Sequence, residues 1–351
     1  MKVKLFLLML LPLRMSSLLF VPGLGGSVIY DGIKKTVLWP PSIRDILRKD
    51  EYYKKIGTYY INQKFVPKIQ SSQVGLMNNT INDIDVIPFW LNPLLKHSYM
   101  TEMYYNIRAQ SPNLYMETMP WDFRIIGNVD YRQDLYQKLK LQMEKIRQEN
   151  QKPVLIIAHS LGGLLIHDFL CKQDESWKKY NVQELITINS PWGGSFSALK
   201  MIVTNKVELS VNGNENSRIT IPNANEYSGI LGSIPHPIIK GAFYNESYKH
   251  ILSKYWLHYR DLSANVLKNA NVKTSIIYSN HLDTPISIVK NKNNEYEFVY
   301  GKGDGIIDEK SLLLPLTWKN ANEFISLINI NDDHTKILKN PKLLEYITSI
   351  L

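Results

Sequence analysis

The stretch from residue 154 to residue 170 constrains the fold of this chain more than any other. It opens with an uninterrupted apolar run at residues 154–158, which is typical of a buried parallel strand. Ser160 follows, and residues 161–170 then carry apolar side chains at helical spacing. A strand, a sharp turn that carries a serine and a helix are the context of a nucleophile elbow, and the small Gly162 leaves room for such a turn. We therefore predict that Ser160 is a nucleophile; the alternative is a helix N-cap serine in a Rossmann-like domain.

Further strands and helices are predicted to alternate along the chain. Apolar runs predict strands at residues 18–21, 114–118, 184–188, 272–278, 295–300 and 324–328. Helical spacing predicts helices near residues 42–55, 131–146, 246–267 and 341–351. This alternation predicts an α/β fold with a mostly parallel sheet and helices on both faces. Residues 17–351 then form one domain, with cap insertions at about 34–110 and a cap or lid at about 203–254.

Ser160 needs a base and an orienting carboxylate, because a serine at its ordinary pKa is a weak nucleophile. With a nucleophile elbow these partners follow in the order serine, acid, histidine. Asp304 is the best acid candidate, since it lies in a glycine-flanked loop after a predicted strand, and His334 is the only histidine beyond it. His159 is predicted to shape the elbow rather than to act as base, because adjacent side chains diverge. The other candidate acids are Asp308, Asp332 and Asp333.

An oxyanion hole needs two N–H donors that face the developing negative charge. The Leu161 N–H, directly after the nucleophile, is one candidate. The second is predicted in the glycine-rich turn at residues 22–26, after the first strand, where the Leu24 N–H is best placed. The alternative is that this turn is only a tight connection. It does not resemble a phosphate-binding loop, because neither Gly-Lys-Ser/Thr nor G-x-G-x-x-G follows.

Composition limits the partners and cofactors of the chain. Among 351 residues, 41 are basic and 32 are acidic, which gives a net charge of +9. The basic residues are scattered, so an anionic membrane or lipid surface is favoured as partner and nucleic acid is not. There is no HExxH motif or Cys/His cluster, and we expect neither a metal nor another cofactor. Cys171 is the only cysteine, which excludes an intrachain disulfide.

The first residues are similar to a targeting segment. Lys2 and Lys4 precede an apolar run at residues 5–13, so residues 1–16 are predicted to be a signal or anchor segment. The run is too short to span a bilayer as a helix. We expect a secreted protein, or one associated with membranes or an endomembrane lumen, with the cytoplasm as the alternative.

Five stretches together resemble the lecithin:cholesterol acyltransferase family, which includes lysosomal phospholipase A2 and phospholipid:diacylglycerol acyltransferases. They stand in the order of the family and cover most of the chain. Pro-Trp-Gly-Gly-Ser after an elbow strand is the most specific of them. The stretches are Phe-Val-Pro-Gly-Leu-Gly-Gly at 20–26, Pro-Trp-Asp-Phe-Arg at 120–124, Ala-His-Ser-Leu-Gly-Gly at 158–163, Ser-Pro-Trp-Gly-Gly-Ser at 190–195 and Gly-Asp-Gly at 303–305.

The resemblance implies an α/β-hydrolase fold with Ser160, Asp304 and His334 as catalytic triad and the Leu24 and Leu161 amides as oxyanion hole. It also implies a serine-dependent acyl hydrolase or O-acyltransferase that acts on glycerophospholipid esters at a membrane or lipid-particle surface. The alternatives are a triacylglycerol lipase or carboxylesterase with the same triad, and a catalytically idle hydrolase fold that binds lipid.

One departure from the family concerns the membrane-contacting loop, which a disulfide closes in animal members. Residues 39–75 contain no cysteine. Interfacial attachment is therefore predicted to use an apolar face of Trp39, Ile43, Ile46 and Leu47, unless this face packs on the core. Trp192 either lines an acyl pocket or belongs to the core, so Trp39 and Trp192 are the candidate substrate-binding residues.

Overall fold

A computed structural model describes residues 16–34, 36–42, 44–45, 48–62, 64–74, 99–210, 218–222, 230, 264–293 and 296–351. The predicted signal or anchor segment lies outside the described residues, apart from Ser16. Most of the predicted helix near residues 246–267 also lies outside them.

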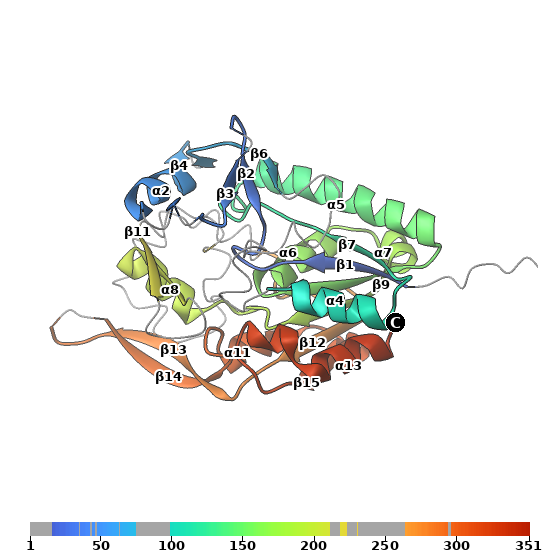
Figure 1. Ribbon diagram of the computed structural model, residues 1–351. Coiled ribbons are helices and arrows are strands. Elements are labelled where there is room, and N and C mark those ends of the chain that lie inside the picture. Colours follow the sequence, from blue (N-terminus) through green and yellow to red (C-terminus); the bar gives the residue numbers. More distant parts are fainter. Residues whose placement is uncertain are drawn as a thin grey trace, which may run out of the picture.

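Six parallel strands form the central sheet (Figure 1). Every hydrogen-bonded pair of neighbouring strands in it is parallel, which confirms the predicted sheet. In spatial order the strands are β15 (Ile325–Asn329), β12 (Thr274–Tyr278), β9 (Val182–Ile188), β8 (Val154–His159), β1 (Ser17–Val21) and β7 (Tyr115–Thr118).

Helices cover both faces of this sheet, because its strands bury alternate side chains in two separate cores. Leu19, Val21 and Ile156 join α5 (Val129–Asn150) and α6 (Leu161–Leu170) in one core. The intervening residues of the same strands, such as Leu18, Phe20 and Ile157, join α4 (Thr101–Gln110) and α13 (Pro341–Ser349) in the other. The period of two residues in a strand thus produces two apolar layers.

The first insertion forms a small cap above the carboxyl ends of the strands (Figure 1). It contains a three-stranded sheet, helix α2 (Lys49–Ile56) and a two-stranded hairpin. Helix α4, which falls inside the predicted insertion of 34–110, packs in the second core with the central sheet. The cap strands are β2 (Ile29–Asp31), β3 (Val37–Trp39) and β6 (Ser71–Val74), with β4 (Thr58–Ile61) and β5 (Lys64–Pro67) in the hairpin.

A buried ion pair joins the cap to the body of the protein. The Arg124 guanidinium donates to both carboxylate oxygens of Asp122, at 3.0 and 2.7 Å, and both side chains are fully buried. Arg124 also donates to the Ile69 carbonyl, and the Ser71 hydroxyl donates to Asp122. Two residues of the Pro-Trp-Asp-Phe-Arg stretch therefore fix the position of the cap segment that contains β6.

The second insertion begins after α8 (Phe196–Thr204) with the antiparallel pair β10 (Lys206–Ser210) and β11 (Arg218–Pro222). The remaining short elements lie in connections around the sheet. They are α7 (Glu175–Asn181), α11 (Glu309–Leu312), the 3-10 helix η4 (Leu314–Thr317), α12 (Ala321–Phe324) and the 3-10 helix η5 (Lys336–Lys339).

One expectation about the sheet is wrong. The predicted strand at 295–300 is not a member of the central sheet: it is β14 (Tyr296–Gly303), which pairs antiparallel with β13 (Leu282–Lys290). This hairpin, orange in Figure 1, projects from the body beyond the sheet edge. The apolar residues of β13 are interrupted by Pro285 and by polar residues, so no apolar run predicted this strand.

Candidate active site

Ser160 occupies the sharp turn between β8 and α6, as the sequence predicts. Its backbone has φ 52° and ψ −129°, a strained conformation for a residue with a side chain. The Ser160 N–H donates to the Ile188 carbonyl at 2.8 Å, which holds the turn against β9. Gly162 is needed because a Cβ there would lie 2.4 Å from the Pro22 carbonyl oxygen. The turn thus presents Ser160 at the carboxyl end of the sheet.

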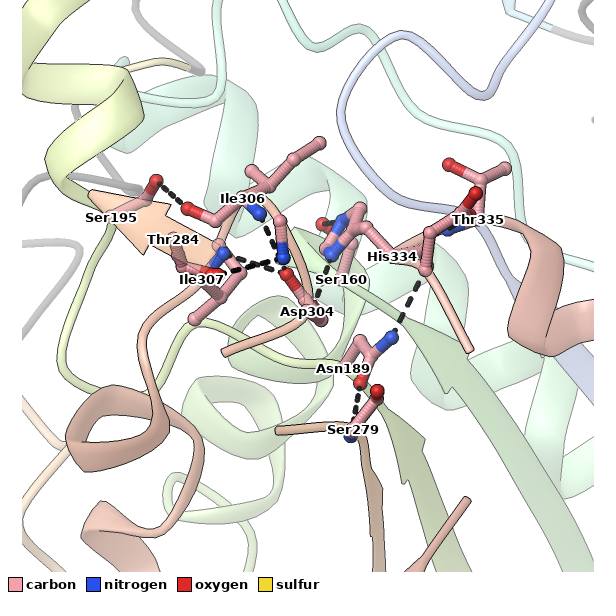
Figure 2. A network of polar contacts seen from close by, with 12 residues as sticks. Ser160, Asn189, Ser195, Ser279, Thr284, Asp304, Ile306, Ile307, His334 and Thr335 are labelled. Carbon is pink, nitrogen blue, oxygen red and sulfur yellow. Dashed lines mark hydrogen bonds and ion pairs between the residues drawn. The ribbon is translucent and has the colours of Figure 1, made fainter. Parts of the chain in front are cut away.

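Ser160, His334 and Asp304 form one continuous chain of hydrogen bonds (Figure 2). The His334 Nε2 lies 2.9 Å from the Ser160 Oγ, and its Nδ1 lies 2.7 Å from the Asp304 Oδ2. An ionised carboxylate only accepts, so the Nδ1 carries the proton and the Nε2 is free to accept from the hydroxyl. The arrangement is that of a nucleophile, a base and an orienting acid.

Asp304 is fully buried and its loop fixes its second oxygen. The Oδ1 accepts from the Ile306 and Ile307 N–H groups at 2.9 and 2.7 Å. The Asp304 carbonyl also accepts from the His334 N–H at 2.9 Å, so backbone and side chain both join the two residues. Asp304 directly follows β14, so it lies after a strand as predicted, but this strand belongs to the hairpin outside the central parallel sheet.

The three alternative acids have other partners. Asp308 caps α11 by accepting from the Ser311 N–H, and burial raises its pKa to about 6. Asp332 accepts from the Asp333 N–H and from the Asn340 side chain. Asp333 accepts from the Thr335 and Lys336 N–H groups and pairs with the Lys336 side chain. Burial acts to raise its pKa, but these contacts outweigh burial and lower the pKa below its ordinary value.

The Pro-Trp-Gly-Gly-Ser stretch holds the acid loop in place (Figure 2). The Ser195 hydroxyl donates to the Ile306 carbonyl at 2.8 Å and caps α8. The Ser311 hydroxyl accepts from the Gly193 N–H at 3.0 Å and donates to the Gly194 carbonyl at 2.6 Å. This stretch therefore contributes to the site through hydrogen bonds to the loop that carries the acid.

The glycine-rich turn after β1 lies directly beside the elbow. A Cβ on Gly23 would be 2.8 Å from the Ser160 Cβ. The Gly23 N–H donates to the Tyr99 hydroxyl, and the Gly26 N–H donates to the Gly23 carbonyl. Among the described residues, no protein acceptor receives the N–H of Leu24 or that of Leu161, the first residue of α6. The role of these two N–H groups as oxyanion donors stays a prediction.

Two tryptophans fix this turn from inside the protein. The Trp121 indole N–H donates to the Pro22 carbonyl at 2.9 Å, and the Trp39 indole N–H donates to the Gly25 carbonyl at 2.6 Å. Trp39 is 8% exposed and packs edge-on against Phe123, with ring centroids 5.4 Å apart. Trp39 therefore packs on the core, the alternative to an exposed interfacial face; Ile43, Ile46 and Leu47 lie outside the described residues.

Trp192 also belongs to the core. It is 1% exposed and lies edge-on to the rings of His167 and Trp318, with centroids 5.2 Å away in each case. His167 stacks on Trp318 and contacts the Lys268 carbonyl, and burial lowers the pKa of His167 to about 4. The second of the two predicted roles for Trp192, a core side chain, agrees with this environment.

Sequence reasoning missed two residues that contact the site. The Tyr99 hydroxyl lies 2.6 Å from the Nδ1 of His159, and no sequence pattern marks Tyr99. Asn189, directly after β9, has φ 47° and donates its side-chain amide to the His334 carbonyl at 3.3 Å. A polar residue at the carboxyl end of a parallel strand was the available signal for Asn189.

No group of three His, Cys, Asp or Glu side chains suited to a metal ion occurs in the described part of the chain. None of the helices the structure describes is long and apolar enough to cross a membrane.

A parallel sheet covered on both faces, a nucleophile elbow and an acid and a histidine from later loops define an α/β-hydrolase. The crystal structure of the Tle4–Tli4 complex shares the fold: the alignment covers 96% of this chain and 98% of that one, with a TM-score of 0.50 and 11% identity. At this identity the likeness concerns the fold alone.

Sequence comparison adds to the fold class a similarity to one particular family. The family model described as lecithin:cholesterol acyltransferase matches residues 99–228. The phosphatidylcholine-sterol acyltransferase of Gallus gallus is 24% identical over 225 residues, 58% of this chain and 54% of the relative. The lysosomal phospholipase A and acyltransferase of Rattus norvegicus is 23% identical over 252 residues, 66% of this chain and 60% of the relative. The chain is therefore similar to the lecithin:cholesterol acyltransferase family over part of its length, and the alignments span little more than half the length of these relatives.

Proposed function

We propose that this protein is a serine-dependent lipid acyl hydrolase or O-acyltransferase that acts on glycerophospholipid esters. The hydrogen-bonded chain from Ser160 through His334 to Asp304 is the observation that carries the proposal. The names of the two relatives, a phosphatidylcholine-sterol acyltransferase and a phospholipase A and acyltransferase, support the substrate class.

The proposed reaction begins when Ser160 Oγ attacks the carbonyl carbon of a lipid ester and gives its proton to His334 Nε2. Asp304 keeps the imidazole in the required tautomer and stabilises the imidazolium. The negative charge on the former carbonyl oxygen is placed at the Leu24 and Leu161 N–H groups. His334 then protonates the departing alcohol, and an acyl-serine remains.

In the second half of the reaction, His334 removes a proton from the acceptor as the acceptor attacks the acyl-serine. Water as acceptor gives a free fatty acid and a phospholipase reaction. A lipid hydroxyl gives a new ester and an acyltransferase reaction. In both cases His334 returns the proton to Ser160 Oγ, so neither route requires a metal or a redox cofactor.

The proposed site of action is the surface of a membrane or lipid particle. The net charge of +9 favours an anionic surface. The name of the rat relative supports a lumenal compartment, and the predicted secreted or membrane-associated location stays a proposal.

The decisive experiment incubates wild type and Ser160→Ala with mixed liposomes of labelled phosphatidylcholine, a sterol and diacylglycerol. Mass spectrometry follows free fatty acid, acyl-sterol and triacylglycerol together. Products that disappear with Ser160→Ala support the serine mechanism, and their identity separates phospholipase from acyltransferase.

Two other outcomes would contradict the proposal. Hydrolysis of soluble p-nitrophenyl esters or triacylglycerol without activity on phosphatidylcholine would favour the carboxylesterase or lipase alternative. A folded, liposome-bound wild type that forms no product and whose Ser160 does not react with a fluorophosphonate would indicate a catalytically idle fold.

A further inference from the structure

A row of buried hydrogen bonds links the glycine-rich turn to the backbone carbonyl of His334. The Gly23 N–H donates to the Tyr99 Oη at 2.8 Å, and this Oη lies 2.6 Å from the His159 Nδ1. The His159 Nε2 lies 2.8 Å from the His334 carbonyl oxygen. None of these atoms belongs to the triad side chains or to the two candidate oxyanion donors.

Only one arrangement of protons satisfies this row. The His334 carbonyl can only accept, so the His159 Nε2 carries the hydrogen. Burial and the neighbouring His334 lower the pKa of His159 to about 3, so its ring is neutral and its Nδ1 accepts. The Tyr99 hydroxyl therefore donates to the Nδ1 and accepts from the Gly23 N–H. Burial raises the pKa of Tyr99 above its ordinary value, which keeps this hydroxyl protonated.

Ring packing makes the row rigid. The rings of Tyr99 and His159 meet edge to face with centroids 5.3 Å apart, and those of His159 and His334 lie 4.9 Å apart. His159 is 2% exposed. The Tyr99 ring also packs on the turn, since a Cβ on Gly26 would lie 2.9 Å from it. The turn and the base therefore share one support.

We propose that Tyr99 and His159 are positioning residues, which set the distance between the candidate oxyanion donor at Leu24 and the base His334. This inference rests on the proposed function. The Tyr99 hydroxyl accepts from the Gly23 N–H and so fixes the backbone directly before the Leu24 amide. The His159 N–H holds the backbone of His334 while Asp304 holds its ring.

The test uses Tyr99→Phe, which removes only the shared oxygen atom. Misplaced catalytic groups slow chemistry more than they weaken binding, so kcat should fall roughly 10- to 100-fold while KM stays within about twofold. The readouts are p-nitrophenyl butyrate hydrolysis and phosphatidylcholine cleavage in vesicles, each at a temperature well below the melting point of every variant. Tyr105→Phe, on the α4 helix that begins two residues after Tyr99, is the matched control; Tyr105 is 55% exposed, and both readouts should stay unchanged.

Variants of His159 give an independent test of the positioning role. His159→Gln keeps an amide N–H near the position of the Nε2 and should retain more activity than His159→Leu, which has no donor. The double variant Tyr99→Phe/His159→Leu should be no slower than His159→Leu alone, because the two residues act as one unit. A general loss of stability would not give both results, namely higher activity of His159→Gln than of His159→Leu and no further loss in the double variant.

The failures of the two proposals are distinguishable. A wild type that cleaves neither substrate would overturn the proposed function, and this inference with it. An active wild type whose Tyr99→Phe variant keeps its kcat, or whose His159→Gln and His159→Leu variants are equally slow, would overturn the positioning role alone.

Discussion

The elbow that carries Ser160 and the loop that carries Asp304 hold two ends of the same hydrogen-bonded chain, yet they are built differently. The elbow joins β8 and α6, which are adjacent in sequence and buried along their whole lengths. The acid loop follows a hairpin outside the central sheet, and most side chains of its strand β14 are partly or fully exposed. Close packing of buried elements therefore fixes the elbow, whereas the acid loop, which is less buried, depends on hydrogen bonds.

Hydrogen bonds from distant segments fix the acid loop. The Gly305 N–H donates to the Thr284 hydroxyl, and the Ile306 carbonyl accepts from Ser195, more than a hundred residues earlier in the chain. The elbow instead depends on the absence of side-chain atoms, at Gly162 against the Pro22 carbonyl. The elbow has no room for an added side-chain atom at Gly162, because the Pro22 carbonyl lies too close. The acid loop is held by hydrogen bonds and has more room for a small added group. The two regions should therefore respond differently to substitution.

The largest effect is expected from Asp304→Asn. It leaves the loop in place but removes the acceptor that selects the His334 tautomer, so kcat for p-nitrophenyl butyrate should fall about 10⁴-fold. Asp332→Asn, at one of the alternative acids, is the matched control and should stay close to wild type. Similar losses in both variants would show that the loop, and not the His334–Asp304 contact, limits activity.

A smaller effect, on stability, is expected when an alanine replaces a glycine in each region. Gly162→Ala places a methyl group 2.4 Å from the Pro22 carbonyl oxygen. Overpacking of this kind should lower the free energy of unfolding by about 2 to 3 kcal/mol. Gly305→Ala meets only Leu282 at 3.5 Å and has φ +94°, so it should cost about 1 kcal/mol through backbone strain. Urea denaturation measures both, and a larger loss for Gly305→Ala would reverse the comparison.

The last effect is a modest gain in stability, which is expected from Asp308→Asn in the acid loop. Burial raises the pKa of Asp308 from 3.8 to about 6, so the folded protein binds this proton more tightly than the unfolded chain. The group's contribution to stability is complete below about pH 3.8 and is lost as the pH rises through 6. An asparagine keeps the α11 cap without a buried charge, and should raise the free energy of unfolding at pH 7.5 by about 1 to 2 kcal/mol.

Denaturation curves of Asp308→Asn and wild type at pH 4 and pH 7.5 check this sign. The difference between them should nearly vanish at pH 4, where the wild-type carboxyl is protonated in the folded state. A gain that is equal at both pH values would mean that the stabilisation does not come from the buried charge.

Much of the fold could be predicted because periodicity follows directly from burial. The strands at β1, β8 and β9 are apolar on both faces, and the structure divides their side chains between two cores. The hairpin β13–β14 could not be predicted in the same way. An apolar run predicted β14 as a strand, but β13 was not predicted, and residue spacing does not encode which strand β14 pairs with.

For the site, motifs predicted which residues lie together but not what each supporting residue contacts. Residues 160, 304 and 334 could be chosen from chain order and loop position, and the structure joins them by hydrogen bonds. Trp39 and Trp192 were candidates for substrate contact, yet both are buried in the core. The sequence alone does not distinguish a tryptophan that lines a pocket from one that packs in the core or supports a turn.

By itself, the sequence determined the parallel sheet, the elbow and the order of the three site residues, because local burial patterns and glycine positions dictate strands and tight turns. Only the tertiary structure decided that Tyr99 and His159 connect the glycine-rich turn to His334, and that Ser195 and Ser311 hold the acid loop. These are contacts between segments far apart in the chain. Hydrogen bonds of this kind depend on the final placement of donors and acceptors, which residue spacing along a chain does not specify.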